Sequence, residues 1–132
     1  MKSAEPLNSP LIERLPAVRG RLDSNESLSR FTRFKVGGPA DVLFRPADVD
    51  DLSAFLVGCP LDVPVMVMGN ASNMLVRDGG VRGVVIRLGR AFQKIRMDGE
   101  FVHAGGGAAD LSIHITRFFS QQTFGQCFSS VI

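Results

Sequence analysis

The segment GNASNMLVRDGG (69–80) carries the strongest chemical signal in the sequence. It follows the apolar run VPVMVM (63–68), so the chain leaves a predicted strand through a row of small or amide-bearing residues. Such residues leave main-chain N–H groups uncovered, and these groups can converge on an anion. Ser72 adds a hydroxyl donor, and the amides of residues 70–73 form a candidate nest for phosphate oxygens. Gly, Asn and Ser also populate surface turns, so a plain turn is the alternative.

Other residues with reactive side chains are isolated in the sequence. His103 and His114 have no carboxylate or second histidine at ligand spacing, and Cys59 and Cys127 lack a C-x-x-C spacing. We therefore expect structural histidines, reduced thiols and no metal site. GGGAAD (105–110) lacks the closing small residue of a dinucleotide fingerprint, and no Walker sequence occurs.

Composition indicates one globular domain of 132 residues, with 45% hydrophobic and 21% charged residues. The net charge of +2 comes from scattered basic residues, which disfavours nucleic acid as a partner. No secretory leader or bilayer-spanning run is visible, so we expect no membrane partner and a cytoplasmic location. Four arginines surround one predicted strand, where we expect a solvated face: Arg77, Arg82, Arg87 and Arg90.

The predicted elements around the loop form a small α/β unit. The first residues offer at most a short helix that ends near Gly20, and DSNESLSR (23–30) is interpreted as a polar connector. A short strand is expected around residues 41–44. The apolar runs VPVMVM (63–68) and GVVIRL (83–88) are typical of strands that are covered on both faces of a parallel sheet.

A helix and a hairpin complete the predicted elements. Apolar spacing in ADVDDLSAFLVGC predicts a helix with Asp48 as N-cap and Asp51 three residues later, which resembles a capping box. Alternation around Asp98 and Gly99 predicts a tight antiparallel hairpin. Residues 109–122 are a further helix candidate, with apolar side chains on one face.

Three spaced segments of the chain resemble the UDP-N-acetylenolpyruvoylglucosamine reductase family. They are RFTRFKVGGPADVLFRPADVDDLSAFL, PVMVMGNASNMLVRDGGVRGVVIRLGRAF and HAGGGA, and the likeness runs from about residue 11 to about residue 122. The most specific feature is the order of T-x-F-x-V-G-G-P-A, then G-x-x-S-N-x-L-V-x-D-G-G, then G-V-V-I. Members of this family are flavoenzymes that make UDP-N-acetylmuramate for peptidoglycan in the cell wall.

The resemblance implies an α/β (α+β) fold, the FAD-binding domain of the vanillyl-alcohol oxidase and para-cresol methylhydroxylase type. It divides the chain into an N-terminal extension with a short helix (1–30), a first βαβ subdomain (31–90) and the start of an antiparallel second subdomain (91–132). It also implies that NADPH reduces FAD and that FAD reduces the enolpyruvyl group of a nucleotide-sugar substrate. The implied FAD contacts are Gly69, Asn70, Ala71, Ser72, Asn73 and Met74 around the pyrophosphate, with Ala104 and Gly105 toward the flavin.

Two departures from the family pattern qualify this expectation. Ala71 stands where the family has a second glycine, and if the position needs a positive φ, alanine costs on the order of 1 kcal/mol and weakens FAD binding. The ending TFGQCFSSVI lacks the Gly-Leu-Glu-Phe and I-P-G-x-x-G-G segments of the family. We therefore expect a truncated member without catalytic residues or a substrate domain, inactive alone.

The alternative function class is a non-catalytic remnant or interaction module that folds without flavin. Loss of a partner domain would leave apolar side chains exposed and favour self-association. The aromatic residues concerned lie near the end of the chain: Phe118, Phe119, Phe124 and Phe128.

Overall fold

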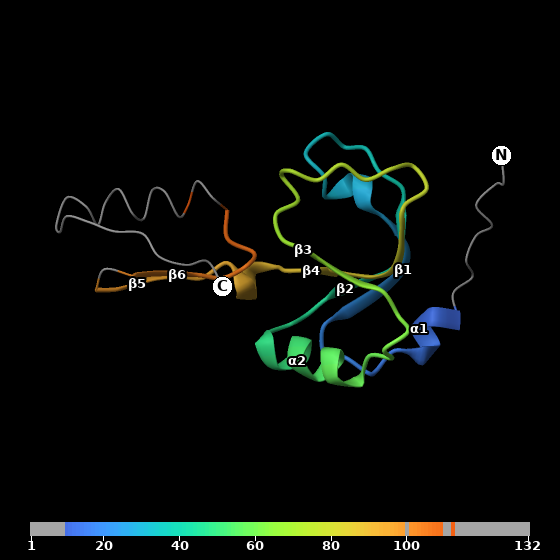
Figure 1. The fold of residues 1–132 in the computed structure, drawn as a ribbon, viewed down its shortest axis with the longest axis horizontal. Coiled ribbons are helices and arrows are strands. Elements are labelled where there is room, and N and C mark those ends of the chain that lie inside the picture. The colour runs from blue at the N-terminus through green and yellow to red at the C-terminus, as the bar shows by residue number, and fades with distance from the viewer. Residues whose placement is uncertain (1–9, 100, 110–111, 113–132) are drawn as a thin grey trace.

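The computed structural model describes residues 10–99, 101–109 and 112 (Figure 1). No helix among these residues is long and apolar enough to cross a membrane. In chain order the elements are α1 (Pro10–Arg14), β1 (Arg21–Ser27), the 3-10 turn η1 (Leu28–Arg30), β2 (Pro39–Arg45), α2 (Val49–Gly58), β3 (Val65–Met68), β4 (Val81–Arg87), the 3-10 turn η2 (Arg90–Phe92), β5 (Ile95–Asp98) and β6 (Phe101–Ala104).

Four strands form one sheet in the order β1-β2-β4-β3. β2, β4 and β3 run parallel, and β1 joins β2 in the antiparallel direction. The middle of β4 is fully buried at Val84, Val85 and Ile86, as its apolar run predicts. The predicted parallel unit is confirmed, with α2 connecting β2 to β3.

β3 lies at the edge of this sheet, so the prediction of an inner strand covered on both faces was wrong. Val65 and Val67 are 40% and 58% exposed, and Met68 is the one buried residue of the strand. β4 pairs with both β2 and β3 and thereby takes the central position. An apolar run predicts a strand, but it does not fix the strand's place in the sheet.

β1 replaces the polar connector that the sequence predicts between residues 23 and 30. Its main chain pairs with β2 from Arg21 opposite Arg45 to Ser27 opposite Pro39. Asp23 pairs with the guanidinium of Arg45 across the two strands. β1 is an edge strand whose side chains are all exposed or partly buried, so its sequence lacks the apolar alternation that would reveal it.

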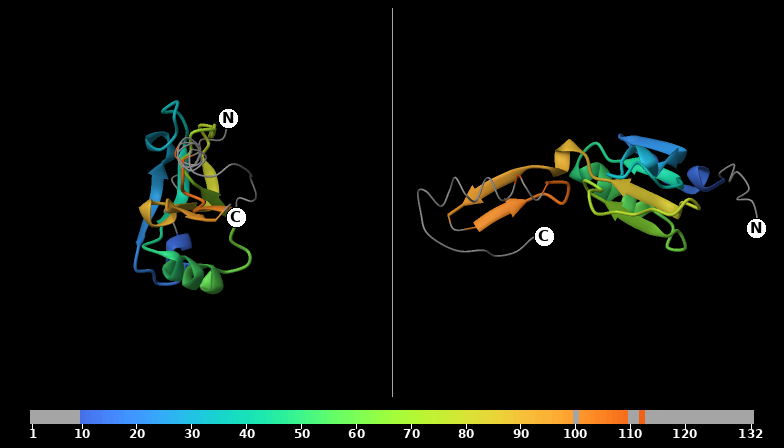
Figure 2. Two further views of the ribbon diagram at one scale, coloured as in Figure 1. Left: turned by 90° about the vertical axis from the view of Figure 1, so that its left-hand side faces the viewer. Right: turned by 90° about the horizontal axis from the view of Figure 1, so that it is seen from above.

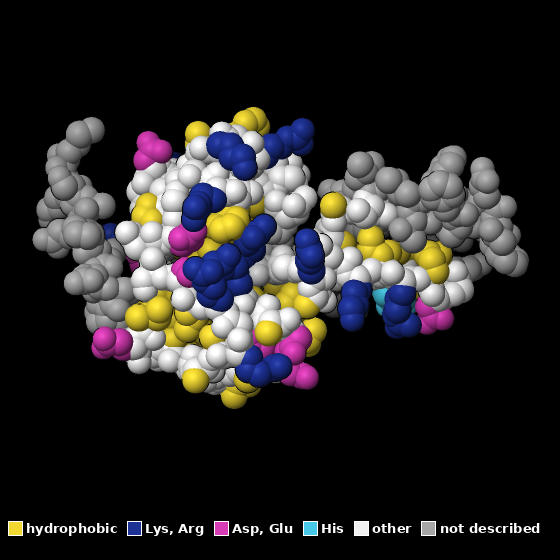
Figure 3. Space-filling view, turned by 180° about the vertical axis from the view of Figure 1, so that it is seen from behind, with side chains coloured by type: hydrophobic (Ala, Val, Ile, Leu, Met, Phe, Trp, Pro, Cys, Tyr) yellow, Lys and Arg dark blue, Asp and Glu magenta, His cyan; other side chains and the backbone are white. Residues whose placement is uncertain are grey.

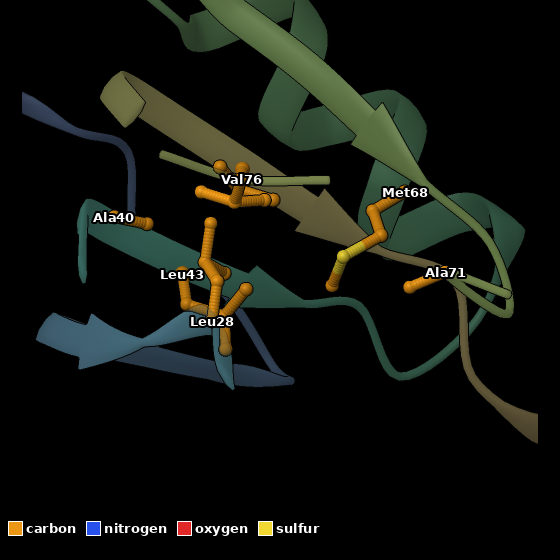
Figure 4. Close-up of a cluster of buried hydrophobic side chains, with 7 residues drawn as sticks. Leu28, Ala40, Leu43, Met68, Ala71 and Val76 are labelled. Atoms are coloured by element: carbon orange, nitrogen blue, oxygen red, sulfur yellow. The ribbon is translucent and has the colours of Figure 1, made fainter. Parts of the chain in front are cut away.

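Each face of the sheet has its own apolar core. α1 and α2 cover one face, and η1 with residues 69–80 covers the other (Figure 1). On the helical face the rings of Phe44 and Phe55 pack with centroids 4.3 Å apart. The opposite core is shown in Figure 4, with Met68 and Ala71 at one end of the cluster and Ala40 at the other.

The β5–β6 hairpin confirms the predicted change from parallel to antiparallel pairing. Asp98 pairs with Phe101, so Asp98 is the last residue of β5. The hairpin follows β4 through η2 and extends away from the four-stranded sheet (Figure 2). The predicted helix over 109–122, together with His114 and Cys127, lies outside the described residues.

Two glycine-containing segments pack backbone to backbone next to the start of β2. The N–H groups of Gly38 and Gly80 both donate to the carbonyl of Arg77, each at 2.9 Å. The bond from Gly80 closes a main-chain turn over residues 77–80. Gly80 has φ +74°, and a Cβ atom there would lie 1.9 Å from the carbonyl oxygen of Pro39.

The buried carboxylate of Asp51 ties the start of α2 to the chain that enters β1. Asp51 is only 4% exposed and accepts hydrogen bonds from the N–H groups of Arg19, Gly20 and Ala47 at 2.8 to 2.9 Å. Asp48 caps α2 by accepting from the N–H of Asp51 at 2.9 Å, as predicted. Burial alone would raise the pKa of Asp51, but its main-chain hydrogen bonds outweigh this effect and leave the pKa below its ordinary value.

Asp51→Asn is expected to destabilise the fold by about 2–3 kcal/mol at pH 7, because an amide cannot satisfy three converging N–H donors. The folded pKa is depressed, so the contribution of Asp51 is present above the unfolded pKa of about 3.9 and is lost as the pH falls through the folded value. Urea unfolding at pH 7 and at pH 3 measures both effects. The exposed neighbour Asp50→Asn should change stability by less than about 0.5 kcal/mol; equal losses in the two variants would contradict this role.

Gly80→Ala is expected to destabilise the fold by roughly 3 kcal/mol or more, since the methyl group meets the Pro39 carbonyl in a left-handed backbone conformation. Gly79→Ala is the matched control, because a Cβ there has no heavy atom within 4 Å. Thermal unfolding of both variants measures the difference. A Gly80→Ala protein as stable as Gly79→Ala would show that the two segments do not pack as described.

Candidate functional site

The candidate loop begins where two parallel strands end together. Met68, the last residue of β3, pairs with Arg87, the last residue of β4. The N–H of Leu88 donates to the carbonyl of Met68 at 2.9 Å and extends this pairing by one residue. Gly69 therefore leaves the sheet at the carboxyl edge, where open parallel sheets bind their ligands.

The main-chain donors of the loop are unengaged. Within the described part of the chain, no N–H group of residues 69–73 donates a hydrogen bond. The side chains of Asn70, Ser72 and Asn73 are exposed and form no hydrogen bonds with described residues. These amides and polar side chains are thus available to an external acceptor. Open donors of this kind are what the predicted anion-binding loop requires.

Ala71 anchors the loop to the sheet. It is 7% exposed and packs in the same core as Met68 and Leu28, and the partly buried Met74 packs against this core too. Ala71 adopts φ +55°, so the condition under which alanine was expected to carry a conformational cost is met. The methyl group of Ala71 is buried, whereas the side chains of its neighbours Asn70 and Ser72 are exposed to solvent.

The fold brings the second predicted stretch against the first. A Cβ atom on Gly69 would lie 2.8 Å from the carbonyl oxygen of Gly106, so the two backbones meet at a position that a side chain would block. Gly105 donates to the carbonyl of Lys94, and Gly107 donates to the carbonyl of Phe92, each at 2.9 Å. Ala104 ends β6 and is partly buried. All eight predicted site residues therefore lie in two neighbouring segments, 69–74 and 104–105.

The four arginines expected on a solvated face do not behave alike. Arg77 and Arg90 are exposed, and Arg82 is 65% exposed with its guanidinium 3.8 Å from Asp41. Arg87 differs, because it is partly buried and its guanidinium carbon lies 4.3 Å from the centroid of the Phe31 ring. The prediction of solvation was wrong for Arg87, since its place beside η1 is fixed by strand pairing that the sequence does not reveal.

Two of the other reactive side chains, His103 and Cys59, lie among the described residues. His103 is exposed on β6, and its Nε2 atom is 3.8 Å from the carboxylate of Asp98 within the hairpin. Cys59 is a partly buried free thiol at the end of α2. Burial first and the charge of Asp62 second raise the pKa of this thiol, which disfavours the reactive thiolate.

The sequence of the chain is similar to those of several UDP-N-acetylenolpyruvoylglucosamine reductases. It is 57% identical over 105 residues to the UDP-N-acetylenolpyruvoylglucosamine reductase of Rhodospirillum rubrum, covering 80% of this chain and 33% of that protein. It is 55% identical over 113 residues to the reductase of Parvibaculum lavamentivorans, covering 86% of this chain and 36% of that protein. No protein-family model matches the chain.

The structural comparison agrees with the sequence comparison. The crystal structure of UDP-N-acetylenolpyruvylglucosamine reductase from Thermus caldophilus matches with a TM-score of 0.57 and 30% sequence identity, over 77% of this chain and 34% of that one. The chain thus spans about a third of the length of the relatives that it matches. Sequence and structure together place it in the UDP-N-acetylenolpyruvoylglucosamine reductase family.

Proposed function

We propose that this chain supplies the FAD-binding portion of a UDP-N-acetylenolpyruvoylglucosamine reductase. The unengaged N–H groups of residues 69–73 carry the proposal, because they lie at the carboxyl edge of the sheet and face no described acceptor. A diphosphate brings several acceptor oxygens to such a row of donors. Family membership supports the same ligand.

The two neighbouring segments divide the proposed cofactor between them. Residues 69–74 would hold the pyrophosphate through main-chain N–H groups and the side chains of Ser72 and Asn73. Ala104 and Gly105 would lie toward the flavin. We further propose that residues 31–90 form the first FAD-binding subdomain, of the vanillyl-alcohol oxidase type, and that the second begins at residue 91. The close contact of Gly69 with Gly106 supports a ligand shared by both parts.

Bound FAD would supply hydride transfer from NADPH to the enolpyruvyl group of a nucleotide sugar, which yields UDP-N-acetylmuramate for peptidoglycan. The residues described here bind and orient the cofactor, and we assign none of them a proton-transfer role. Turnover is proposed for the whole family protein, of which this chain spans about a third. For the chain alone we propose cofactor binding without turnover.

An interaction module that folds without flavin is the competing function. The edge of β3 favours it, because no described strand pairs with this edge, and an edge with exposed Val65 and Val67 can pair with another chain. Leu75, at the end of the candidate loop, is also 77% exposed. Self-association without flavin binding would be the result of this function.

The purified 132-residue chain is expected to bind added FAD with a Kd of tens of micromolar or tighter, which corresponds to about 6 kcal/mol of binding free energy. Replacing both Ser72 and Asn73 by alanine should weaken FAD binding about 10-fold, because two side-chain hydrogen bonds to the diphosphate are lost. Quenching of flavin fluorescence during titration measures both values.

Ser53→Ala is the control for this experiment, since Ser53 is exposed on α2, which covers the other face of the sheet. The control should bind FAD as the wild type does. A folded wild-type chain that takes up no FAD would refute the proposed function. FAD binding that is unchanged in the double variant would show that the loop is an ordinary turn.

A further inference from the structure

Arg87 lies at the same strand end as the candidate loop and on the same face of the sheet. It pairs with Met68, the residue that precedes the loop, and neighbouring side chains on parallel strands point to the same face. Met68 belongs to the core that also contains Ala71, so the loop folds over the face from which Arg87 projects. Phe31 packs against this core, and the guanidinium of Arg87 lies over its ring.

The guanidinium of Arg87 has no acidic partner among the described residues. Its one specific contact there is with the ring of Phe31. Burial and then the charge of Arg45 lower the pKa of Arg87, so both influences act against its positive charge. The aromatic contact is a weak attraction at a partly exposed site and does not replace a counter-ion.

The acidic side chain that pairs with Arg45 already holds two guanidinium groups. Arg45 ends β2 beside Arg87, and Asp23 accepts ion pairs from both Arg45 and Arg21. Two guanidinium groups therefore share the Asp23 carboxylate at this end of the sheet, and Arg87 pairs with no described carboxylate. Figure 3 shows the gathered Lys and Arg side chains, with acidic side chains beside them, on the face seen from behind.

The Arg87 guanidinium, without a described acidic partner, thus lies at the strand end from which the loop with open N–H donors departs. N–H groups alone provide partial charges, whereas a guanidinium provides a full charge and donors in a planar fork that matches phosphate oxygens. An anion with several oxygens is the ligand class that suits both the loop amides and the guanidinium at the end of β4.

We propose that Arg87 is a diphosphate-binding residue, which neutralises the anion that the N–H groups of residues 69–73 hold. This inference rests on the proposed function and adds to it the source of the counter-charge. Phe31 acts as a positioning residue, because its ring fixes the guanidinium at the strand end.

The test uses the 132-residue chain with three ligands: FAD, inorganic pyrophosphate and riboflavin, which has no phosphate. Arg87→Met keeps much of the aliphatic packing and removes the charge, whereas Arg87→Lys keeps the charge. Arg82→Gln is the matched control, because Arg82 is an exposed arginine at the opposite end of the same strand. Affinity is measured by fluorescence or calorimetry at several salt concentrations, after thermal unfolding has shown that each variant is folded.

Arg87→Met should weaken FAD and pyrophosphate binding about 10- to 100-fold and flatten the dependence of affinity on salt, as expected for a lost charged hydrogen bond. Arg87→Lys should recover most of the affinity. Riboflavin binding by every variant, and FAD binding by Arg82→Gln, should match the wild type.

Two results separate this inference from the proposed function. A wild-type chain that binds FAD equally well after Arg87→Met would overturn the role of Arg87 and leave the FAD site intact. A wild-type chain that binds pyrophosphate through Arg87 but takes up no FAD would support the anion site and overturn the flavin assignment. If the wild type binds neither ligand, both fail.

Discussion

Parallel pairing of β3 with β4 is the constraint on which the site depends. It ends both strands at one edge of the sheet, with Met68 opposite Arg87. The loop after Met68 and the chain after Arg87 therefore start side by side, although the two residues are not neighbours in the sequence. Without this register, the open N–H groups and the unpaired guanidinium would face different parts of the surface. A slip of one residue would send Met68 and Arg87 to opposite faces.

Backbone contacts then bring the second segment to the first. Gly69 lies against the carbonyl of Gly106, and Gly107 is bonded to the η2 turn through Phe92. A Cβ atom would lie 2.8 Å from the Gly106 carbonyl oxygen at Gly69 and 2.0 Å from the Phe92 carbonyl oxygen at Gly105, which is a physical reason for glycine at these two positions. Ala71 holds the loop from below with its buried methyl group despite its positive φ. A family glycine at this position would lose the methyl contact and relieve the strain.

Features whose signal lies within a few residues could be predicted from the sequence. The Asp48 cap, the parallel strands and the hairpin belong to this group, and so does the exposed loop after β3. β1 could not be found, because its polar sequence becomes a strand only by pairing with β2. The edge position of β3, the contact between Gly69 and Gly106, and the stacking of Arg87 on Phe31 all depend on pairing between distant segments. No local pattern reports them.

The most direct test of the anion site is a nuclear magnetic resonance titration of the ¹⁵N-labelled chain with FAD and, separately, with inorganic pyrophosphate. Both ligands should shift the amide protons of residues 69–73 downfield, because these N–H groups gain phosphate acceptors, while FAD alone should also shift Ala104 and Gly105. Unchanged amide resonances for residues 69–73 at saturating ligand, with shifts elsewhere, would contradict the account.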